Sequence, residues 1–135
     1  MKKDIYLRKK SYEINTLKSE IKEIQEKIDI IEKDIVRKKN LYKKREKENF
    51  DDSMSLLTKE LFLNSLLKEI NELSIKKDRI EEILNYKKNI LSTLLGEKKA
   101  YESFIEKKEI KEEKKENEKE NRLANEIYIR KHYNS

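Results

Sequence analysis

The stretch INTLKSEIKEIQEKIDIIEKDI, residues 14–35, decides the fold of this 135-residue chain. Its isoleucines and leucines recur at alternating intervals of three and four residues, and the positions between them are mostly charged or polar. This spacing is typical of the a and d positions of a coiled-coil helix, whose apolar side chains form one seam. The seam reaches back to Leu7 and forward to Tyr42, with Lys38 out of character. We therefore predict a first helix over about residues 3–48.

A second seam of the same kind occupies the rest of the chain. It begins at Leu63 and keeps its register for six heptads, to Ile105, with lysines at 77, 87 and 98 where an apolar residue is missing. This predicts a second helix over about residues 55–132. Residues 49–53 between the seams disfavour helix interiors and favour caps, so we place the single turn at about 49–54. Asp52, Ser53 and Ser55 are the alternatives for the N-cap of the second helix.

Two seamed helices around one turn predict an all-α fold. The expected architecture is a single domain over residues 1–135, an antiparallel two-helix coiled-coil hairpin with the second helix longer and projecting. If the turn is centred near residue 51, facing residues have numbers that add to 101 or 102. The predicted pairs are then Ile35 with Leu66, Ile31 with Ile70, Ile28 with Leu73, and Ile21 with Ile80.

The composition argues against most other classes of fold and function. Of all residues 46% are charged, and there is one Gly and no Pro or Cys, so sheets, phosphate-binding loops and thiolate metal sites are excluded. No apolar run approaches the roughly 20 residues that a membrane-spanning helix needs, and no apolar segment follows the basic start as in a secretory signal. His132 has no second His or Cys to share a metal, and Asp51 and Asp52 suit a turn better than an acid pair. We expect no catalytic, metal-binding or cofactor-binding residue, no small-molecule substrate and no enzymatic activity.

A basic run lies just before the turn. Residues 37–47 contain seven Lys or Arg and one Glu, a net charge of +6 that equals the net charge of the whole chain. A few cations at a helix C-terminus complement the helix dipole, but seven are more than stability requires. The run predicts a docking surface for an acidic protein, a nucleic acid or an anionic lipid face.

A charged stretch without a seam follows the second seam. Residues 106–122 contain seven Lys or Arg, seven Glu and a single apolar residue, Ile110. Apolar residues then return from Leu123 to Ile129. The stretch is open to two interpretations, a solvated tail or a shaft that becomes ordered inside a partner, and the returning apolar cluster favours the shaft.

The chain resembles the FliJ family, small stalk-like proteins of the flagellar type III export apparatus that have injectisome counterparts. The resemblance rests on the two-helix pattern and on the C-terminal sequences KKAY, residues 98–101, and ENRLANEIYIR, residues 120–130. Asn125-Glu126 stands where the family more often has Asp-Glu. The resemblance implies a non-enzymatic coupling factor for flagellar protein export. It would be cytoplasmic and peripherally associated with the cytoplasmic side of the inner membrane.

The resemblance also implies partners and contact residues. In this family the chain ends stand inside the hexameric export ATPase ring and promote its assembly and activity, while the tip contacts the large membrane protein of the export gate; export chaperones also bind. The ring candidates are Leu123, Ile127, Tyr128 and Arg130. The gate-binding candidates, from the resemblance and the basic run together, are Lys38, Tyr42, Lys43, Arg45, Leu66, Ile70 and Lys77. The alternative function is a basic coiled coil that binds nucleic acid or serves as an adaptor, and nucleic acid is the less favoured partner.

Overall fold

Two long helices make up the chain. The computed structural model describes the backbone of residues 2–133 and the side chains of residues 5–131. Within that range the helices are α1 (Lys2–Glu46) and α2 (Ser53–Tyr133), and there is no strand. These bounds lie within two residues of the predicted ones. The chain, treated above as one domain, divides into two compact units, Met1–Leu94 and Leu95–Ser135, and each is described by itself.

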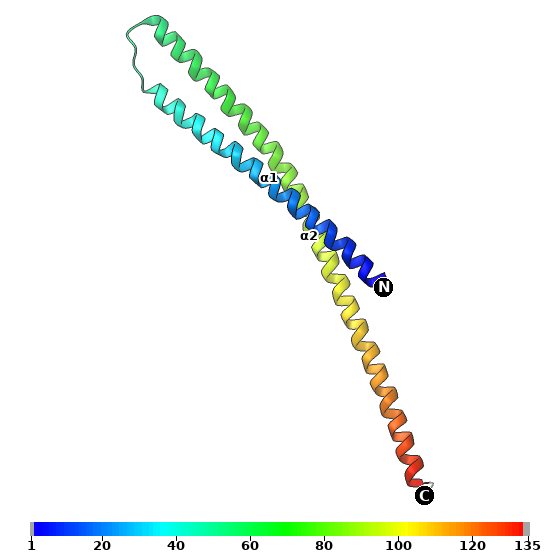
Figure 1. Ribbon diagram of the computed structural model, residues 1–135. Helices are drawn as coiled ribbons and strands as arrows, with labels where there is room; N and C mark the ends of the chain where they lie inside the picture. Colours follow the sequence, from blue (N-terminus) through cyan, green and yellow to red (C-terminus); the bar gives the residue numbers. More distant parts are fainter. Residues whose placement is uncertain (1, 134–135) are drawn as a thin grey trace. The chain divides into compact units, whose positions relative to one another are not determined.

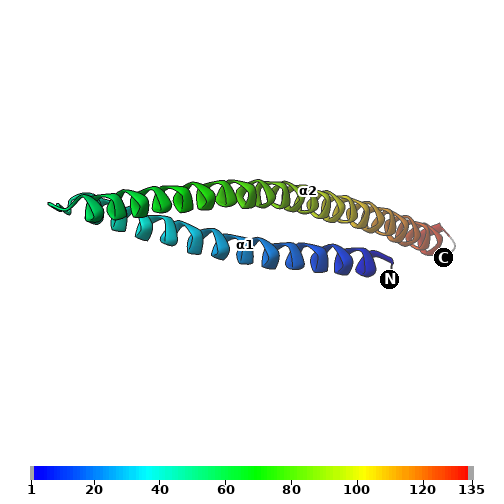
Figure 2. The same cartoon turned by 90° about the horizontal axis from the view of Figure 1, so that it is seen from above.

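The first unit is a helical hairpin. α1 and the first half of α2 run antiparallel and side by side, and the loop Lys47–Asp52 joins them at one end (Figures 1 and 2). The all-α fold and the two packed helices predicted from the seams are confirmed. With no Pro in the chain and no Gly before residue 96, nothing in the sequence interrupts either helix of the hairpin.

The seams form the core of the hairpin. The buried hydrophobic side chains all occupy predicted seam positions: Ile14, Leu17, Ile21, Ile28, Ile31, Ile35, Leu66 and Leu84. Partly buried seam residues pack against this core, among them Ile24, Ile80, Leu91 and Leu94. Among the described side chains none is less than 2% exposed, because two helices can cover only one face of each other. Burial of each Leu or Ile contributes about 1.5–3 kcal/mol, so the seam dominates the stability of the hairpin.

The register of the hairpin differs from the predicted one by one heptad. Three seam lysines reach carboxylates on the opposite helix: Lys38 Nζ lies 3.1 Å from Glu69, Lys77 Nζ 3.0 Å from Glu32, and Lys87 Nζ 2.6 Å from Glu20. The two residue numbers of each pair add to 107, 109 and 107. Facing residues therefore have numbers that add to about 108, rather than to the predicted 101, and we name each register by this sum. The predicted pairing of Ile28 with Leu73 is therefore wrong. Ile28 instead lines a surface hollow together with Leu84.

Charge pairing favours this register over its neighbours. A shift of seven residues keeps every a position opposite a d position, so the apolar pattern cannot choose between registers one heptad apart. In the observed register Lys38, Lys77 and Lys87 each meet a Glu. In a register centred on 101, the three lysines would instead face Phe62, Gln25 and Glu13, in the same order. In a register centred on 115, they would face Lys76, Lys39 and Lys27. The observed register is the one that gives all three lysines a carboxylate.

This register leaves the start of α2 without a neighbour on α1. Glu46, the last residue of α1, stands level with Phe62, whereas α2 already begins at Ser53. About two turns of α2 therefore extend past the end of α1, and the loop returns along them. We call residues 45–62 the tip.

The second unit is the remaining length of α2. Its residues are helical as far as Tyr133, and Lys98 forms an i,i+4 ion pair with Glu102 at 3.9 Å. Every side chain from Glu106 to Lys131 is exposed. The predicted charged stretch is thus helical here, and its side chains are in contact with solvent.

Candidate interaction surfaces

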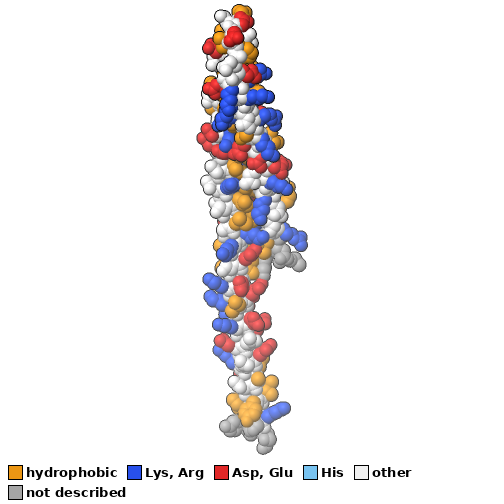
Figure 3. All heavy atoms as spheres, turned by 90° about the vertical axis from the view of Figure 1, so that its left-hand side faces the viewer, with side chains coloured by type: hydrophobic (Ala, Val, Ile, Leu, Met, Phe, Trp, Pro, Cys, Tyr) orange, Lys and Arg blue, Asp and Glu red, His pale blue; other side chains and the backbone are white. Residues whose placement is uncertain are grey.

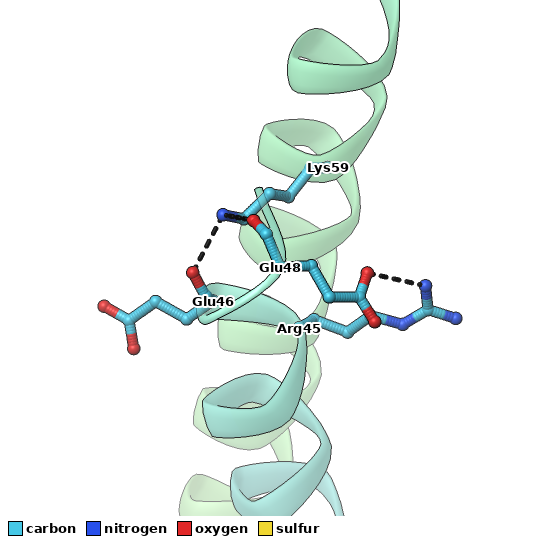
Figure 4. Close-up of polar contacts among 4 residues, drawn as sticks. All are labelled: Arg45, Glu46, Glu48 and Lys59. Atoms are coloured by element: carbon cyan, nitrogen blue, oxygen red, sulfur yellow. Dashed lines mark hydrogen bonds and ion pairs between the residues drawn. The ribbon is translucent and has the colours of Figure 1, made fainter. Parts of the chain in front are cut away.

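The tip is held together by contacts between the end of α1, the loop and α2. Lys59 Nζ donates hydrogen bonds to the backbone carbonyl oxygens of Glu46, at 2.8 Å, and Glu48, at 2.6 Å (Figure 4). The bond to Glu46 satisfies a carbonyl group that the end of α1 leaves without an intrahelical partner, and the bond to Glu48 ties the loop to α2. Arg45 pairs with Glu48 at 3.2 Å, and its guanidinium lies 5.3 Å from the ring centre of Phe62. A lysine from the second turn of α2 therefore caps α1.

Asp52 begins α2. Its Oδ1 accepts a hydrogen bond from the Met54 backbone N–H at 3.2 Å, and its Oδ2 accepts one from the Ser55 hydroxyl at 3.2 Å. The Asp52 carbonyl oxygen also accepts the first intrahelical bond, from the Leu56 N–H. Of the three N-cap alternatives, Asp52 is thus the one observed. Its carboxylate also stabilises the positive end of the helix dipole, a structural role rather than that of an acid pair.

A groove of about 420 Å³ opens at the tip. Phe50, Met54 and Phe62 supply its apolar surface, and Arg45, Glu48 and Lys59 its polar edge. Large hydrophobic residues of the tip are exposed in and around it: Phe50, Met54, Leu56, Leu57, Leu61 and Phe62. A run of six exposed apolar side chains in a single loop and helix start is the kind of patch that marks an interaction site.

The seam pattern alone does not predict this apolar surface. It predicts residues 55–62 as the start of the second helix but does not show that no part of the first helix covers them. A signal was present, because Met54, Leu57 and Leu61 share a helix face that is not the face of Leu63 and Leu66. With the correct register, the uncovered position of these residues follows at once.

The predicted gate-binding residues fall into three groups. Lys43 is exposed, and exposed Lys39 and Lys44 accompany it, so basic side chains gather on the hairpin close to the tip (Figure 3). Tyr42 is half-buried and Arg45 is engaged within the tip.

The third group belongs to the seam. Leu66 is buried, with 5% of its surface exposed, and Ile70 is half-buried. Lys38 and Lys77 form ion pairs with Glu69 and Glu32 on the opposite helix. The structure thus places the four residues of this group between or across the helices, and it brings Lys43 and Arg45 close to the apolar tip.

The predicted ring-binding residues lie on the exposed part of α2. Leu123, Ile127 and Tyr128 are 58%, 56% and 62% exposed, and Arg130 is exposed as well. Leu123, Ile127 and Arg130 are separated by four and three residues, which places them on one face of the helix. Leu123 and Ile127 form a short apolar strip on this face of a strongly charged helix, with Arg130 beside them and Tyr128 about 100° further round the helix.

The described part of the chain holds neither a metal-ligating cluster nor a membrane-spanning helix. Among those residues no group of three acidic or His side chains is placed to hold a metal ion. Neither helix, over the same residues, contains a stretch apolar enough to cross a bilayer. His132 lies outside the residues whose side chains are described.

Comparison with known proteins adds no assignment. No protein family model, curated protein or solved structure matches the chain. The two surfaces and the resemblance in the sequence are therefore the basis on which a function is proposed.

Proposed function

We propose that this chain is a non-enzymatic stalk of the FliJ type, which couples a flagellar export ATPase to protein export. The observation that carries the proposal is the exposed helix from Glu106 to Lys131, in which Leu123 and Ile127 lie uncovered on one face. Exposing such a cluster to water is unfavourable, and a partner that covers it recovers the cost. A charged helix with an apolar strip near its end suits insertion into a ring of subunits.

Each surface has a part in this proposal. The strip of Leu123 and Ile127, together with Tyr128 and Arg130, contacts the hexameric ATPase and favours its assembly and activity. The tip, with its exposed apolar groove and the nearby Lys43, contacts the membrane protein of the export gate. Export chaperones are further partners in bacterial flagellum biogenesis. Recruitment to the gate makes the protein cytoplasmic and peripheral to the inner face of the membrane.

The proposal is tested by substituting the apolar strip. Leu123→Ser with Ile127→Ser is expected to abolish stimulation of the purified export ATPase, because it removes the apolar anchor and leaves every charge in place. The form ending at Lys107 should lose stimulation too, while its thermal unfolding stays close to that of the full chain, since the removed side chains are exposed.

The matched control is Ile110→Ser, an apolar-to-polar change on the same helix at a residue that is 47% exposed but outside the strip. The Ile110→Ser variant should stimulate the export ATPase as strongly as the parent chain does. Full stimulation by the Leu123 and Ile127 variant would contradict the ring contact. Binding to DNA or RNA that falls steeply with salt would instead support the nucleic-acid alternative.

A further inference from the structure

The hairpin has a second register available to it, one heptad away from the observed one. Over residues 7–94 the observed register, centred on 108, places six apolar pairs opposite each other along the seams, and a register centred on 101 also places six. Ile28, for example, faces Ile80 in the first and Leu73 in the second. The burial of apolar seam side chains, which is the main contribution to the stability of the hairpin, is therefore nearly equal in the two registers.

The ion pairs distinguish the two registers only weakly. All three cross-helix pairs are made by lysines whose side chains remain 26–29% exposed. In the slipped register Lys87 would meet Glu13, Lys77 would meet Gln25, and Lys38 would meet the ring of Phe62. One ion pair is kept, and amide and aromatic partners replace the other two carboxylates. Partly exposed pairs contribute little individually, so their exchange does not forbid the slip.

The loop permits the slip in one direction. Six residues, Lys47–Asp52, span at most about 25 Å. In the observed register Glu46 and Ser53, the two helix ends that the loop joins, are nine residues apart along the axis of α2, which is about 14 Å. The two helix axes are about 9 Å apart, so the loop must span roughly 16 Å. The slipped register brings the ends to within about 10 Å. After a slip in the opposite direction the loop would have to span about 26 Å, slightly more than its full reach. That slip would also place Lys38, Lys77 and Lys87 opposite other lysines.

The contacts of the tip fasten the observed register. Lys59 holds the carbonyl groups of Glu46 and Glu48, and Arg45 lies against Phe62. All of these break when Glu46 moves along α2 to the level of Ser55. The same movement would bring the end of α1 alongside Leu56, which is exposed in the observed register.

We propose that the hairpin is a two-state device in which α1 slides by one heptad, about 10 Å, along α2. A partner that binds the exposed tip prefers the observed register, because the slip covers or rearranges its surface. Binding at the tip and the position of the N-terminal end of α1 are thereby coupled. The proposal concerns the hairpin alone and does not depend on the identity of the partner.

Disulfide trapping tests the proposal in the full-length chain, which has no cysteine of its own. Three double variants share Ile28→Cys. Ile80→Cys reports the observed register, Leu73→Cys the slipped one, and Lys87→Cys the slip in the opposite direction. In any one register only the matching pair comes within disulfide range, because the others are offset by about 10 Å. Far-UV circular dichroism first checks that each variant is helical, and the protein is diluted so that links between chains are separable on a gel.

We expect the Ile80 variant to form its disulfide fastest. The Leu73 variant should form its disulfide more slowly but to completion, and the Lys87 variant should remain reduced. Closure of the Leu73 variant no faster than that of the Lys87 variant would overturn the proposal, since both require the same displacement. If both close at similar rates, general loosening of the hairpin explains the links and the proposal fails.

A pair of matched substitutions tests the mechanism. Glu69→Gln removes an ion pair present only in the observed register and should speed closure of the Leu73 variant about two- to fivefold. Glu13→Gln removes a carboxylate that is needed only in the slipped register and should slow closure by a similar factor. Equal effects of the two substitutions would contradict a discrete slip.

Discussion

Three lysines occupy positions that a coiled coil normally gives to apolar residues. Lys38, Lys77 and Lys87 lay their carbon chains along the seam and carry their ammonium groups to its edge, where a Glu from the opposite helix receives each. Because the lysine side chains are about a quarter exposed and their Glu partners 43–48% exposed, solvent screens each pair and its contribution to stability is small. Their main effect is on specificity, since they meet carboxylates in one register and fewer or none in its neighbours.

The Lys77 pair predicts a dependence of stability on pH. The hydrogen bond to Glu32 raises the pKa of Lys77 above its ordinary value of 10.5, burial opposes this, and the charges of Glu32, Glu81 and Asp78 add to the rise. A raised pKa means that the folded state holds the proton more tightly than the unfolded state. The resulting stability is complete below pH 10.5 and is lost as the pH rises through the folded-state pKa.

Glu32→Gln should therefore be less stable than the parent chain at about pH 8, and the difference should shrink above pH 10.5. Urea unfolding followed by circular dichroism at both ends of this range measures it. Glu26→Gln, an exposed residue on the same helix, is the control and should behave like the parent chain at every pH. A deficit for Glu32→Gln that stays constant with pH would contradict this assignment.

At the scale of the element, the two helices are ended by different means. α1 ends where Lys59 binds the carbonyl group of its last residue, Glu46, and α2 begins where the Asp52 carboxylate accepts hydrogen bonds from Met54 and Ser55. The first is a contact between residues thirteen apart, and the second is local. The local cap belongs to α2 alone, so its removal is a clean test.

Asp52→Ala should lower the free energy of unfolding by about 1 kcal/mol, because the Met54 N–H and the Ser55 hydroxyl lose their acceptor. Asp51→Ala removes the same charge one residue earlier without removing those bonds, and it should change stability by less than about 0.5 kcal/mol. Chemical denaturation of both variants measures the difference. An equal loss in the two would show that charge near the helix start, rather than the cap, is responsible.

At the scale of the whole molecule, the net charge of +6 is concentrated in residues 37–47, beside the apolar tip. Lys39, Lys43 and Lys44 are exposed there, whereas Lys38 and Arg45 are already paired. The surface offered to a partner thus combines exposed cations with exposed apolar side chains. An acidic partner with an apolar strip complements both.

If the tip contacts the export gate as proposed, Lys43→Gln with Lys44→Gln should leave the helical signal unchanged and weaken binding to the cytoplasmic part of the export-gate protein severalfold. The loss should be largest at low salt, because screening reduces the contribution of exposed charges. Lys114→Gln with Lys115→Gln makes the same change of charge on the other unit and should bind normally. Unchanged gate binding by the tip variant, together with lost nucleic-acid binding, would favour the alternative function.

The heptad spacing was sufficient to predict two helices, their seam residues and the position of the turn. It did so because apolar side chains at intervals of three and four can be buried only along one face of a helix, whatever that helix packs against. The candidate surfaces were partly predictable for the same reason. The basic run and the apolar strip around Leu123 stand out because neither fits a seam.

The register, and with it the groove, was decided by the tertiary structure. A sequence that repeats every seven residues is unchanged by a shift of seven, so the apolar pattern leaves the pairing of the helices open. The lysine partners across the hairpin, Glu69, Glu32 and Glu20, lie between 31 and 67 residues away in sequence and become neighbours only when the helices meet. That pairing leaves two turns of α2 beyond the end of α1, and the exposed Phe50, Met54 and Leu57 follow from it. The local spacing determined which faces are buried. Contacts between residues distant in sequence, the cross-helix ion pairs and those of the tip, determined which residues meet, because these contacts change when one helix slides along the other.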